Sequence, residues 1–556
     1  MSNKEIAAIF SLLAKLMELH GDNGFKAKAY STAAFRISKL GKPLAETDIQ
    51  SLSIPGLGEA ILQKIQVVLQ TGELPLLQEY IGKTPAGVVD MLAVKGIGPK
   101  KIALLWHELG IESIGELAYA CAENRLIALR GFGEKTQAAV LENIRFIQKN
   151  EGHFLFAELE AQAESLTQQL QTAFPGRETH ITGAFRRQLP VLDRLEWLTE
   201  IGKPDLISWL KGFAFSSFQE SENRLEVQSD HLPKLIFYFS KEKQFARLLF
   251  ETTNTEEFRQ AFLEDYMLPE SVEKEEDIFS RNKLPFIIPA LRENAQSLAL
   301  AKAQGLPQVI QPADIRGIIH SHSQYSDGLH SLEDMAVAAK NKGYEYLVIS
   351  DHSQTAVYAN GLKPERIIAQ HAEIDQLNSR LAPFRIFKGI ESDILGDGSL
   401  DYDPDVLNNF EVIIASIHSN LKMDEEKAMQ RLIRAVENPY TTILGHPTGR
   451  LLLSRPGYPV QHKKLIDACI ANKVIIEINA HPRRLDLDWS WIPYALEKGA
   501  LLSVDPDAHA IDGMGLVKYG VLAAQKGGLR AADNLSSKTR AELIDFLAVR
   551  KTERGE

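Results

Sequence analysis

The second half of the chain alternates short apolar runs with segments whose apolar residues recur at helical spacing. The apolar runs, each short enough for a buried strand, are 315–320, 346–350, 384–390, 410–417, 441–445, 474–479 and 501–504. The segments with a helical period include 331–342, 364–381, 425–438 and 462–472. Repeated alternation of strand and helix is typical of a parallel β/α barrel. We therefore predict a barrel over residues 314–556.

Most of the apolar runs end in a histidine or a carboxylate. These polar residues are His320, His322, Asp351, His352, Glu391, Asp393, His418, His446, Asp505, Asp507 and His509. Of the 15 His in the chain, ten lie beyond residue 300, and six of these end or directly follow an apolar run. The carboxyl ends of barrel strands meet at one face, and imidazole and carboxylate groups bind divalent metals. The sequence therefore predicts a metal centre at this face.

The first of these stretches, Gly317-Ile-Ile-His320-Ser-His322, also has a simpler explanation. Residues i and i+2 of a strand point to the same side, so His320 and His322 are expected to face one ion. A lone His-x-His is more often a pair of partly exposed polar residues than a metal site. The repetition of polar strand ends is not explained in that way, and Asp327 on a Ser-Asp-Gly turn is close enough to add a carboxylate.

The N-terminal third is predicted to be helical, with three similar turns that each precede a helix. Helices are expected over 6–19, 30–40, 59–71, 101–109 and 136–148. The three turns contain the pairs Gly56 and Gly58, Gly96 and Gly98, and Gly131 and Gly133. Glycines of this spacing let the backbone and the N–H groups of the next helix approach a phosphate, as in a helix-hairpin-helix motif. Three such turns predict sequence-independent binding to the DNA backbone, whereas one alone would equally fit an ordinary connector.

Charge and composition place limits on this prediction. The formal net charge is -11, but residues 1–150 carry 17 Lys and Arg against 15 Asp and Glu, so this arm is mildly basic on an acidic chain. Local contacts with nucleic acid are therefore expected, and a broad positive field is not. The cysteines, Cys121 and Cys469, lie far apart and imply no disulfide framework. We expect neither a signal peptide nor a membrane span, and a cytoplasmic protein.

The stretch 314–556 resembles a PHP (polymerase and histidinol phosphatase) domain. The resemblance rests on His-x-His, Ser-Asp-Gly, Asp-His-Ser, Glu-x-Asp-Ile-Leu, Ser-Ile-His-Ser, Gly-His-Pro-Thr-Gly-Arg, Glu-Ile-Asn-Ala and Asp-Ala-His. It implies three divalent ions and nine ligands. One ion would be held by His320, His322, Glu391 and Asp507, a second by Glu391, His418 and His446, and a third by Asp327, His352 and His509. It also implies catalytic roles for Glu391, Asp507 and Arg450. Arg450 and Arg483 are expected to clamp a phosphate group. Zinc and manganese both suit these ligands, and iron is compatible.

Residues 1–150 are similar to the N-terminal domains of family X DNA polymerases. The similarity rests on Pro55-Gly-Leu-Gly58-Glu-Ala-Ile-Leu-Gln-Lys64-Ile and on Gly131-Phe-Gly-Glu-Lys135. It implies that Lys64 occupies the position of a Schiff-base nucleophile for abasic sugars, and that Lys26 and Tyr30 lie near a 5′-phosphate pocket. The alternative for Lys64 is a solvated helix lysine. Ala60 stands where the family has a further basic residue, which favours this alternative.

The middle of the chain, 151–300, resembles the palm and thumb of the same family but departs from it at the metal-binding positions. Ile181-Thr-Gly183-Ala184-Phe-Arg-Arg187 matches the family's Gly-Ser-x-Arg-Arg-Gly, and its Asp-x-Asp falls on Arg194 and Glu196. The third aspartate should fall on 235–239, which has no acidic residue. Two carboxylates at i and i+2 are needed to hold two magnesium ions together. We therefore expect a polymerase-shaped scaffold without polymerase chemistry.

The expected fold class is multidomain α+β and α/β: a helix-hairpin-helix arm, a polymerase-β-like palm and thumb, and a distorted (β/α)7 PHP barrel. The expected domains are 1–82, 83–150, 151–300 and 314–556, with a linker over 301–313. The expected function is a metal-dependent 3′–5′ exonuclease in DNA repair that contacts gapped, nicked or 3′-ended duplex. The alternatives are an active polymerase with a proofreading PHP domain, a histidinol-phosphatase-type phosphoesterase and a non-catalytic DNA-binding scaffold. The oligomeric state is left open, a monomer being compatible with the sequence.

Overall fold

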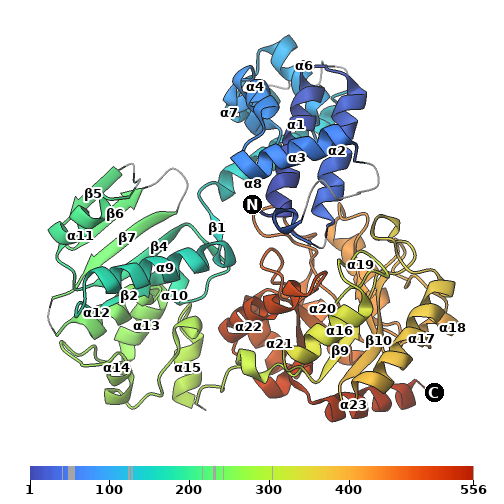
Figure 1. The fold of residues 1–556 in the computed structure, drawn as a ribbon. Coiled ribbons are helices and arrows are strands. Elements are labelled where there is room, and N and C mark those ends of the chain that lie inside the picture. The colour runs from blue at the N-terminus through green and yellow to red at the C-terminus, as the bar shows by residue number, and fades with distance from the viewer. Residues whose placement is uncertain are drawn as a thin grey trace. The chain divides into compact units, whose positions relative to one another are not determined.

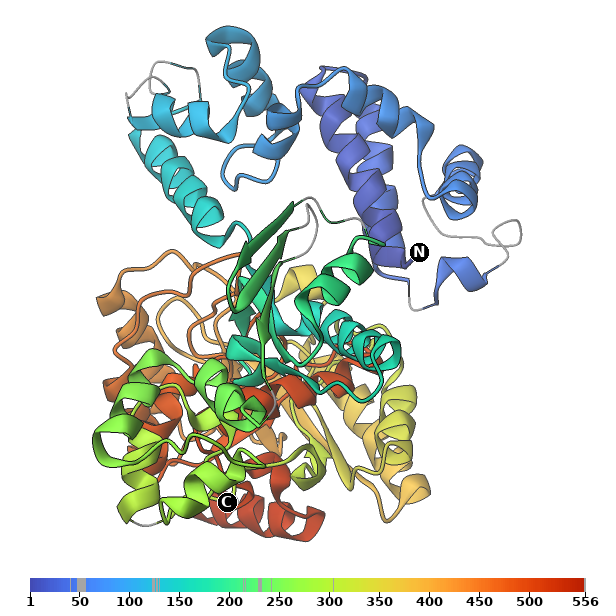
Figure 2. The ribbon, with the colours of Figure 1, turned by 90° about the vertical axis from the view of Figure 1, so that its left-hand side faces the viewer.

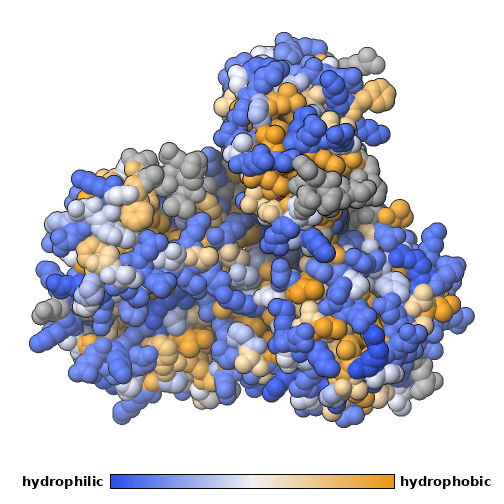
Figure 3. Space-filling model, in the orientation of Figure 1, coloured by the Kyte–Doolittle hydropathy of each residue, from blue (hydrophilic) through white to orange (hydrophobic). Residues whose placement is uncertain are grey.

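The structure, a computed structural model, describes residues 1–40, 42–47, 57–122, 126, 129, 131–213, 215, 217–228, 233–241, 243–303 and 305–554. It contains two compact units, Met1–Glu151 and Gly152–Glu556 (Figure 1). The finer division of the chain into four domains and a linker stays a prediction. No helix within the described ranges is long and apolar enough to cross a membrane. On the face drawn in Figure 3, apolar residues form small groups between hydrophilic ones.

The first unit is built from helices. They are α1 (Asn3–Leu19), α2 (Gly24–Ser38), α3 (Glu59–Thr71), α4 (Pro75–Gly82), α5 (Ala86–Met91), α6 (Pro99–Leu109), α7 (Ile114–Ala122) and α8 (Glu134–Asn150). A capping box between Ser2 and Glu5 starts α1. Helix α2 begins six residues before the predicted Tyr30, because the side chain of Asn23 caps it by accepting a hydrogen bond from the N–H of Phe25.

The second unit begins with a mixed sheet that corresponds to the predicted palm. Its strands are β2 (Thr179–Thr182), β4 (Arg194–Thr199), β5 (Ser217–Ser221), β6 (Arg224–Gln228) and β7 (Lys234–Phe239), in the order β2-β4-β7-β6-β5. A short pair, β1 (Phe154–Leu155) and β3 (Val191–Leu192), lies beside it. The helices of this part are α9 (Phe156–Ala173), α10 (Gly183–Arg186), α11 (Lys203–Leu210), α12 (Phe245–Thr253), α13 (Glu256–Asp265), α14 (Glu276–Arg281) and α15 (Gln296–Ala303).

The remainder of the second unit is the predicted barrel. Its parallel strands follow in chain order: β8 (Gly317–Ile318), β9 (Tyr346–Ile349), β10 (Arg385–Asp393), β11 (Val412–Ser416), β12 (Ile443–Leu444), β13 (Ile475–Asn479) and β14 (Leu502–Asp505). Its helices are α16 (Leu332–Asn341), α17 (Pro364–Leu381), α18 (Pro404–Leu407), α19 (Glu425–Val436), α20 (His462–Ala471), α21 (Ile492–Glu497), α22 (Val517–Lys526) and α23 (Arg540–Glu553). Figures 1 and 2 show these helices outside the strands.

The strands form a nearly closed barrel, which confirms the predicted fold class. Strand residues alternate between two apolar clusters: Tyr346 and Val348 pack in one, and Leu347 and Ile349 in the other. The first and last strands meet just beyond their ends, where Ala508 exchanges backbone hydrogen bonds of 3.1 and 2.9 Å with His320 and His322. The predicted strand over 315–320 was too long, because β8 ends at Ile318 and His320 adopts a φ of 59°.

Candidate metal centre

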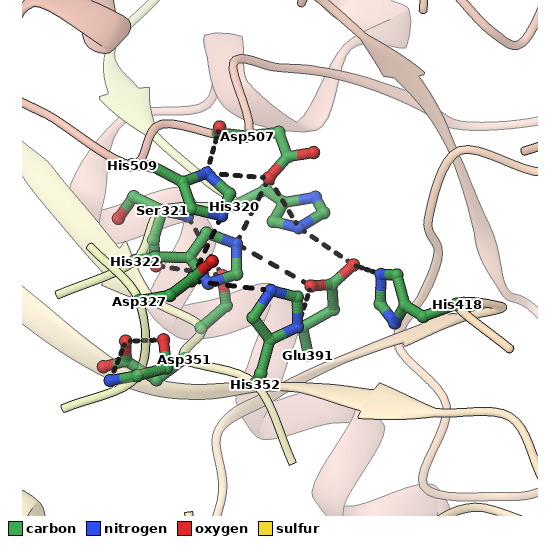
Figure 4. Close-up of polar contacts among 12 residues, drawn as sticks. His320, Ser321, His322, Asp327, Asp351, His352, Glu391, His418, Asp507 and His509 are labelled. Carbon is green, nitrogen blue, oxygen red and sulfur yellow. Dashed lines mark hydrogen bonds and ion pairs between the residues drawn. The ribbon is translucent and has the colours of Figure 1, made fainter. Parts of the chain in front are cut away.

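The structure brings all nine predicted ligands together at the carboxyl ends of the barrel strands. Glu391 lies within β10, and the other eight residues follow β8, β9, β11, β12 or β14: His320, His322, Asp327, His352, His418, His446, Asp507 and His509. Figure 4 shows the side chains of the labelled histidines and of Asp327, Glu391 and Asp507 pointing toward one another. The side chains of His320 and His322 are fully buried, so this is an enclosed cluster and not a pair of surface histidines.

Glu391 is the centre of this arrangement. Its carboxylate oxygens lie within ion-pair range of five histidine nitrogens, at 3.2 Å for His320, 3.7 Å for His322, 2.9 Å for His352, 3.1 Å for His418 and 3.0 Å for His446. Burial acts to raise the pKa of Glu391, but the surrounding histidines, His418 and His320 foremost, hold it well below its usual range. Glu391 is therefore an ionised carboxylate in a buried site, available to bridge two cations.

The donor atoms fit divalent metal ions. Three overlapping groups each have ligand atoms within 4.8 Å of one another: His320, His322 and Glu391; His352, Glu391 and His418; and His322, Asp327, His352 and His509. The buried Nε2 of His320 and Oε2 of Glu391 have no hydrogen-bond partner of acceptable geometry. Such buried groups are costly unless something binds them, and cations bound by these nitrogen and oxygen atoms would satisfy both. The assignment of individual ligands to individual ions stays a prediction.

Asp507 closes the other side of the cluster. Its Oδ1 lies 3.2 Å from Nε2 of His322 and 3.5 Å from Nε2 of His320, and its Oδ2 accepts a hydrogen bond of 3.2 Å from Asn479. Burial acts to raise the pKa of Asp507, but the adjacent His320 and His322 hold it well below its usual range. Asp507 and Glu391 thus provide two ionised carboxylates that both face Nε2 of His320 and Nε2 of His322.

Three acidic residues that are not among the nine predicted ligands hold the side chains of this cluster in place. Glu477 accepts hydrogen bonds of 2.5 Å from Nδ1 of His320 and 2.6 Å from the backbone N–H of His446. Asp393 lies 2.5 Å from Nδ1 of His418. Asp351 accepts hydrogen bonds from Ser323, Ser326 and Gln370 and so fixes the turn that carries Asp327. The signal in the sequence for Asp351 and Asp393 was their position at strand ends, whereas Glu477 lies within β13.

The arginines near the cluster differ in the groups that their side chains contact. The guanidinium of Arg450 donates to the carboxylate of Asp488 at 2.6 Å and to the carbonyl oxygens of Arg484 and Leu485, so it holds the loop that follows β13. Arg483 donates to Glu158 and Ser454. Arg484, which we did not single out, lies beside the cluster with Nε 3.7 Å from Oδ2 of Asp507. Phosphate binding by Arg450 stays a prediction.

In the described part of the palm, Asp193 and Glu196 are separated by an arginine. Arg194 lies between the two acidic residues, 3.5 Å from an oxygen of Asp193 and 3.5 Å from an oxygen of Glu196. The parallel register pairs Glu196 with Ile236, and the Tyr238 hydroxyl donates to Glu196 at 2.9 Å. The open pocket of about 520 Å³ beside these residues is lined by Arg194 and Tyr238 and by the carboxylates of Glu196, Glu251 and Glu256.

The described glycines of the three turns have a backbone geometry that lets a phosphate approach the chain closely. Gly58, Gly98 and Gly133 are the N-caps of α3, α6 and α8, and Gly96 and Gly131 have φ angles of 95° and 89°. A Cβ at Gly58, Gly96, Gly98 or Gly133 would meet no protein atom within 4 Å, so a phosphate has room to approach. Gly56 lies outside the described residues.

The residues of the predicted lyase pocket, Lys26, Tyr30 and Lys64, lie on α2 and α3. Lys64 lies on α3, half-buried, with Nζ 3.4 Å from the carbonyl oxygen of Ala60. Lys26 is exposed on α2, and Tyr30 is buried against Phe10. No hydrogen bond joins Lys64 to Lys26 or Tyr30 in the part of the chain that the structure describes. A lyase role for Lys64 stays a prediction.

A helix-hairpin-helix arm, a palm-like sheet and a PHP barrel with a histidine and carboxylate cluster define the class of family X DNA polymerase-like proteins with a C-terminal PHP domain. Residues 1–74 match the helix-hairpin-helix domain family, residues 88–145 the SAM-like helix-hairpin-helix tandem family, and residues 319–481 the PHP domain family. The chain is 32% identical, over 98% of its length, to the DNA polymerase/3′-5′ exonuclease PolX of Bacillus subtilis, and the match covers 99% of that protein. The chain therefore belongs to the PolX family.

Two further relatives match only part of this chain. A probable phosphatase of Thermoanaerobacter sp. (strain X514) is 24% identical over 42% of this chain and 96% of its own length. A probable phosphatase of Citrobacter koseri is 30% identical over 29% of this chain and 62% of its own length.

Proposed function

We propose that this chain is a metal-dependent phosphodiesterase that removes nucleotides from DNA 3′ ends during repair, and that its palm no longer incorporates nucleotides. The observation that carries this proposal is the buried cluster around Glu391, in which nine nitrogen- and oxygen-bearing side chains converge. The name of the Bacillus subtilis relative, which includes a 3′-5′ exonuclease, supports the reaction class and polarity.

We propose three divalent ions, zinc or manganese with iron as a further candidate, held by the nine ligands grouped as predicted from the sequence. Such ions, when bound, polarise the scissile phosphate and supply hydroxide at neutral pH. Glu391 and Asp507, both ionised, provide the anionic ligands on the two sides of the cluster. The burial of His320 and His322 excludes bulk water from the inner part of the centre.

The surrounding arginines are proposed to orient the substrate. Arg484 lies beside Asp507, its side chain is 18% exposed, and among the described residues its guanidinium has no hydrogen-bond partner. A guanidinium binds two phosphate oxygens in a fixed geometry. Arg450 supports it indirectly, because Arg450 holds the backbone carbonyl of Arg484.

DNA is proposed to be held through its backbone by the glycine turns. The N-termini of α3, α6 and α8 follow Gly58, Gly98 and Gly133, and the free N–H groups of a helix start favour a phosphate. Lys101, on α6, lies 5.0 Å from the ring of Phe132, so the second and third turns are neighbours and form one surface. Contacts of this kind position a duplex without reading its sequence.

A small-molecule phosphatase is the second candidate function. It is favoured by the names of the probable phosphatases, which match 42% and 29% of this chain. Release of phosphate from histidinol phosphate, compared with nucleotide release from a 3′-labelled duplex, separates the two. A preference for the duplex by the intact protein supports the nuclease, and a preference for the phosphate ester supports the phosphatase.

The first prediction concerns the metal ligands. The double variant His320→Ala with His322→Ala removes two nitrogen ligands from the buried centre. We expect release of nucleotides from a 3′-labelled duplex to fall below detection, while affinity for the duplex, measured by fluorescence anisotropy, stays within about twofold because the arm is unchanged. Undiminished cleavage by the double variant would show that the active site lies elsewhere.

The second prediction concerns Arg484. Arg484→Ala should lower kcat/KM on the 3′-labelled duplex on the order of 10²-fold, because the phosphate loses its orienting contact. Bound metal, measured by mass spectrometry, should be unchanged. The neighbouring Arg483→Ala is the matched control, because the Arg483 guanidinium is 42% exposed and turned to Glu158. Equal losses in both variants would exclude a specific role for Arg484.

The third prediction concerns the glycine turns. Gly131→Val with Gly133→Val should weaken binding to gapped DNA by about tenfold or more, because Val at a φ of 89° strains the turn and its side chain fills the approach to phosphate. Gly152→Val, at a φ of 73° with no protein atom within 4 Å of a Cβ, carries similar strain outside the turns and is the control. If the turn variant stays folded by circular dichroism and binds as the wild type does, the turns are only connectors.

The fourth prediction is that the protein does not extend a primer. Arg194 places a positive charge between Asp193 and Glu196, and Ile236 lies where β7 would need to supply a third acid. The assay uses a gapped duplex, all four nucleotides and magnesium or manganese, with the His320→Ala and His322→Ala variant so that digestion cannot mask synthesis. Template-dependent extension that Glu196→Ala abolishes would show that the palm is an active polymerase.

A further inference from the structure

Two histidines of the cluster are held from behind by buried carboxylates. Nδ1 of His320 lies 2.5 Å from Glu477, whose side chain is completely buried. Because Nδ1 is hydrogen-bonded, Nε2 of His320 is left as the nitrogen that faces Glu391, at 3.2 Å. Glu477 also accepts the backbone N–H of His446 at 2.6 Å. One carboxylate therefore fixes two ligand-bearing loops, those after β8 and β12.

Asp393 does the same for His418. Its Oδ1 lies 2.5 Å from Nδ1 of His418, so Nε2 faces Glu391 at 3.1 Å. The other oxygen of Asp393 accepts a hydrogen bond of 2.9 Å from the Thr355 hydroxyl, and its backbone N–H donates to Ser353 at 2.9 Å. A carboxylate behind a histidine ligand fixes the ring orientation and makes the ligand nitrogen more basic, which strengthens metal binding.

Asp327 and His509 lie on the far side of the cluster. Nδ1 of His509 lies 3.0 Å from the main-chain oxygen of Asp507 and 3.6 Å from its Oδ1, and Asp507 is itself one of the nine predicted ligands. The partner of His509 is therefore a member of the cluster and not a carboxylate behind it. The side chains of His509 and Asp327 are 37% and 19% exposed, whereas those of His320 and Glu391 are 0% and 1% exposed. Water therefore competes for this group, and ordering its side chains on metal binding costs more entropy.

We propose that the centre binds its ions with unequal affinity, with Glu477 and Asp393 as the positioning residues that make two positions tight. The tight positions share Glu391 and use His320 and His418. The position at Asp327 and His509 is labile and exchanges its ion with solvent. This inference rests on the metal-binding part of the proposed function and concerns the retention of ions, not the substrate.

The test is a chelator titration of the full-length protein. The protein is loaded with zinc, desalted and equilibrated with rising concentrations of nitrilotriacetate, and the retained zinc per chain is measured by mass spectrometry. We expect the wild type to lose one ion first and to hold two ions over a further range of chelator. His509→Ala should hold two ions from the start and lose them over the same range as the wild type.

The positioning residues are tested by removing their charge. Glu477→Gln and Asp393→Asn should each release a tight ion at a chelator concentration about 10–100-fold lower than the wild type. Glu411→Gln is the matched control, since Glu411 is also bonded through both oxygens, to Arg385 and to the backbone N–H of Lys388, at the opposite end of the barrel. The control should follow the wild-type curve.

Three outcomes would overturn the proposal: loss of all ions in one step, loss of a tight ion in His509→Ala, or wild-type curves for both positioning variants. If Glu477→Gln does not fold, as judged by circular dichroism, Asp393→Asn tests the same claim at the second histidine. Thr355→Val, which removes the hydroxyl that bonds to Asp393 and Asp401 and keeps the Asp393 carboxylate, provides a milder change with a smaller shift in the same direction. The titration contains no DNA, so a protein that retains ions in two stages but cleaves no DNA would refute the proposed nuclease and leave this inference standing.

Discussion

The structure of the barrel depends on one ionised carboxylate held in a buried site. Glu391 is 1% exposed, and such a charge is stable only with compensating groups around it. Five histidine nitrogens provide part of that compensation, and they come from the loops after β8, β9, β11 and β12. Each of these loops must therefore direct its histidine side chains toward Glu391. This requirement explains why so many polar residues of the cluster are themselves bonded to buried acids.

The same requirement explains the irregular parts of the barrel. A regular strand through His320 would continue the alternation of β8, but the chain leaves the strand after Ile318 and His320 takes a φ of 59°. The backbone of 320–322 instead bonds with Ala508, which joins the two ends of the sheet. Asp507 also has a positive φ, of 52°, and lies next to this junction. Strain at the ligand-bearing residues is thus offset by the hydrogen bonds that close the barrel.

The sequence was sufficient for the architecture and for the ligand cluster, for a physical reason. Strand order follows chain order in this barrel, so polar residues that end successive apolar runs must meet at one face, and His352, Glu391 and His418 could be placed together without coordinates. Partners across the barrel could not be found in this way. Glu477 reaches His320 from 157 positions away, and nothing in its local sequence distinguishes that contact from a bond to a neighbouring loop. The choice between Arg450, Arg483 and Arg484 likewise depends on side-chain direction within one loop. Helix α2 was predicted too short because a single Asn23 cap outweighs a weak periodic pattern.

The palm contacts the barrel through residues other than Asp193, Arg194 and Glu196. Lys526, at the end of α22, is completely buried and donates to the backbone oxygen of Arg187 at 2.7 Å and to Glu293 at 2.8 Å. Lys518 and Tyr519, at the start of the same helix, bond to Glu160. This helix follows the loop that carries Asp507 and His509, and Arg483, in the loop beside it, bonds to Glu158. Replacing the palm carboxylates therefore leaves the attachment of α22 intact, because none of these contacts involves Asp193, Arg194 or Glu196. Loss of the palm itself would expose Lys526 and leave the loop after β14 without this support, so this scaffold role of the palm is physically separate from Asp193, Arg194 and Glu196.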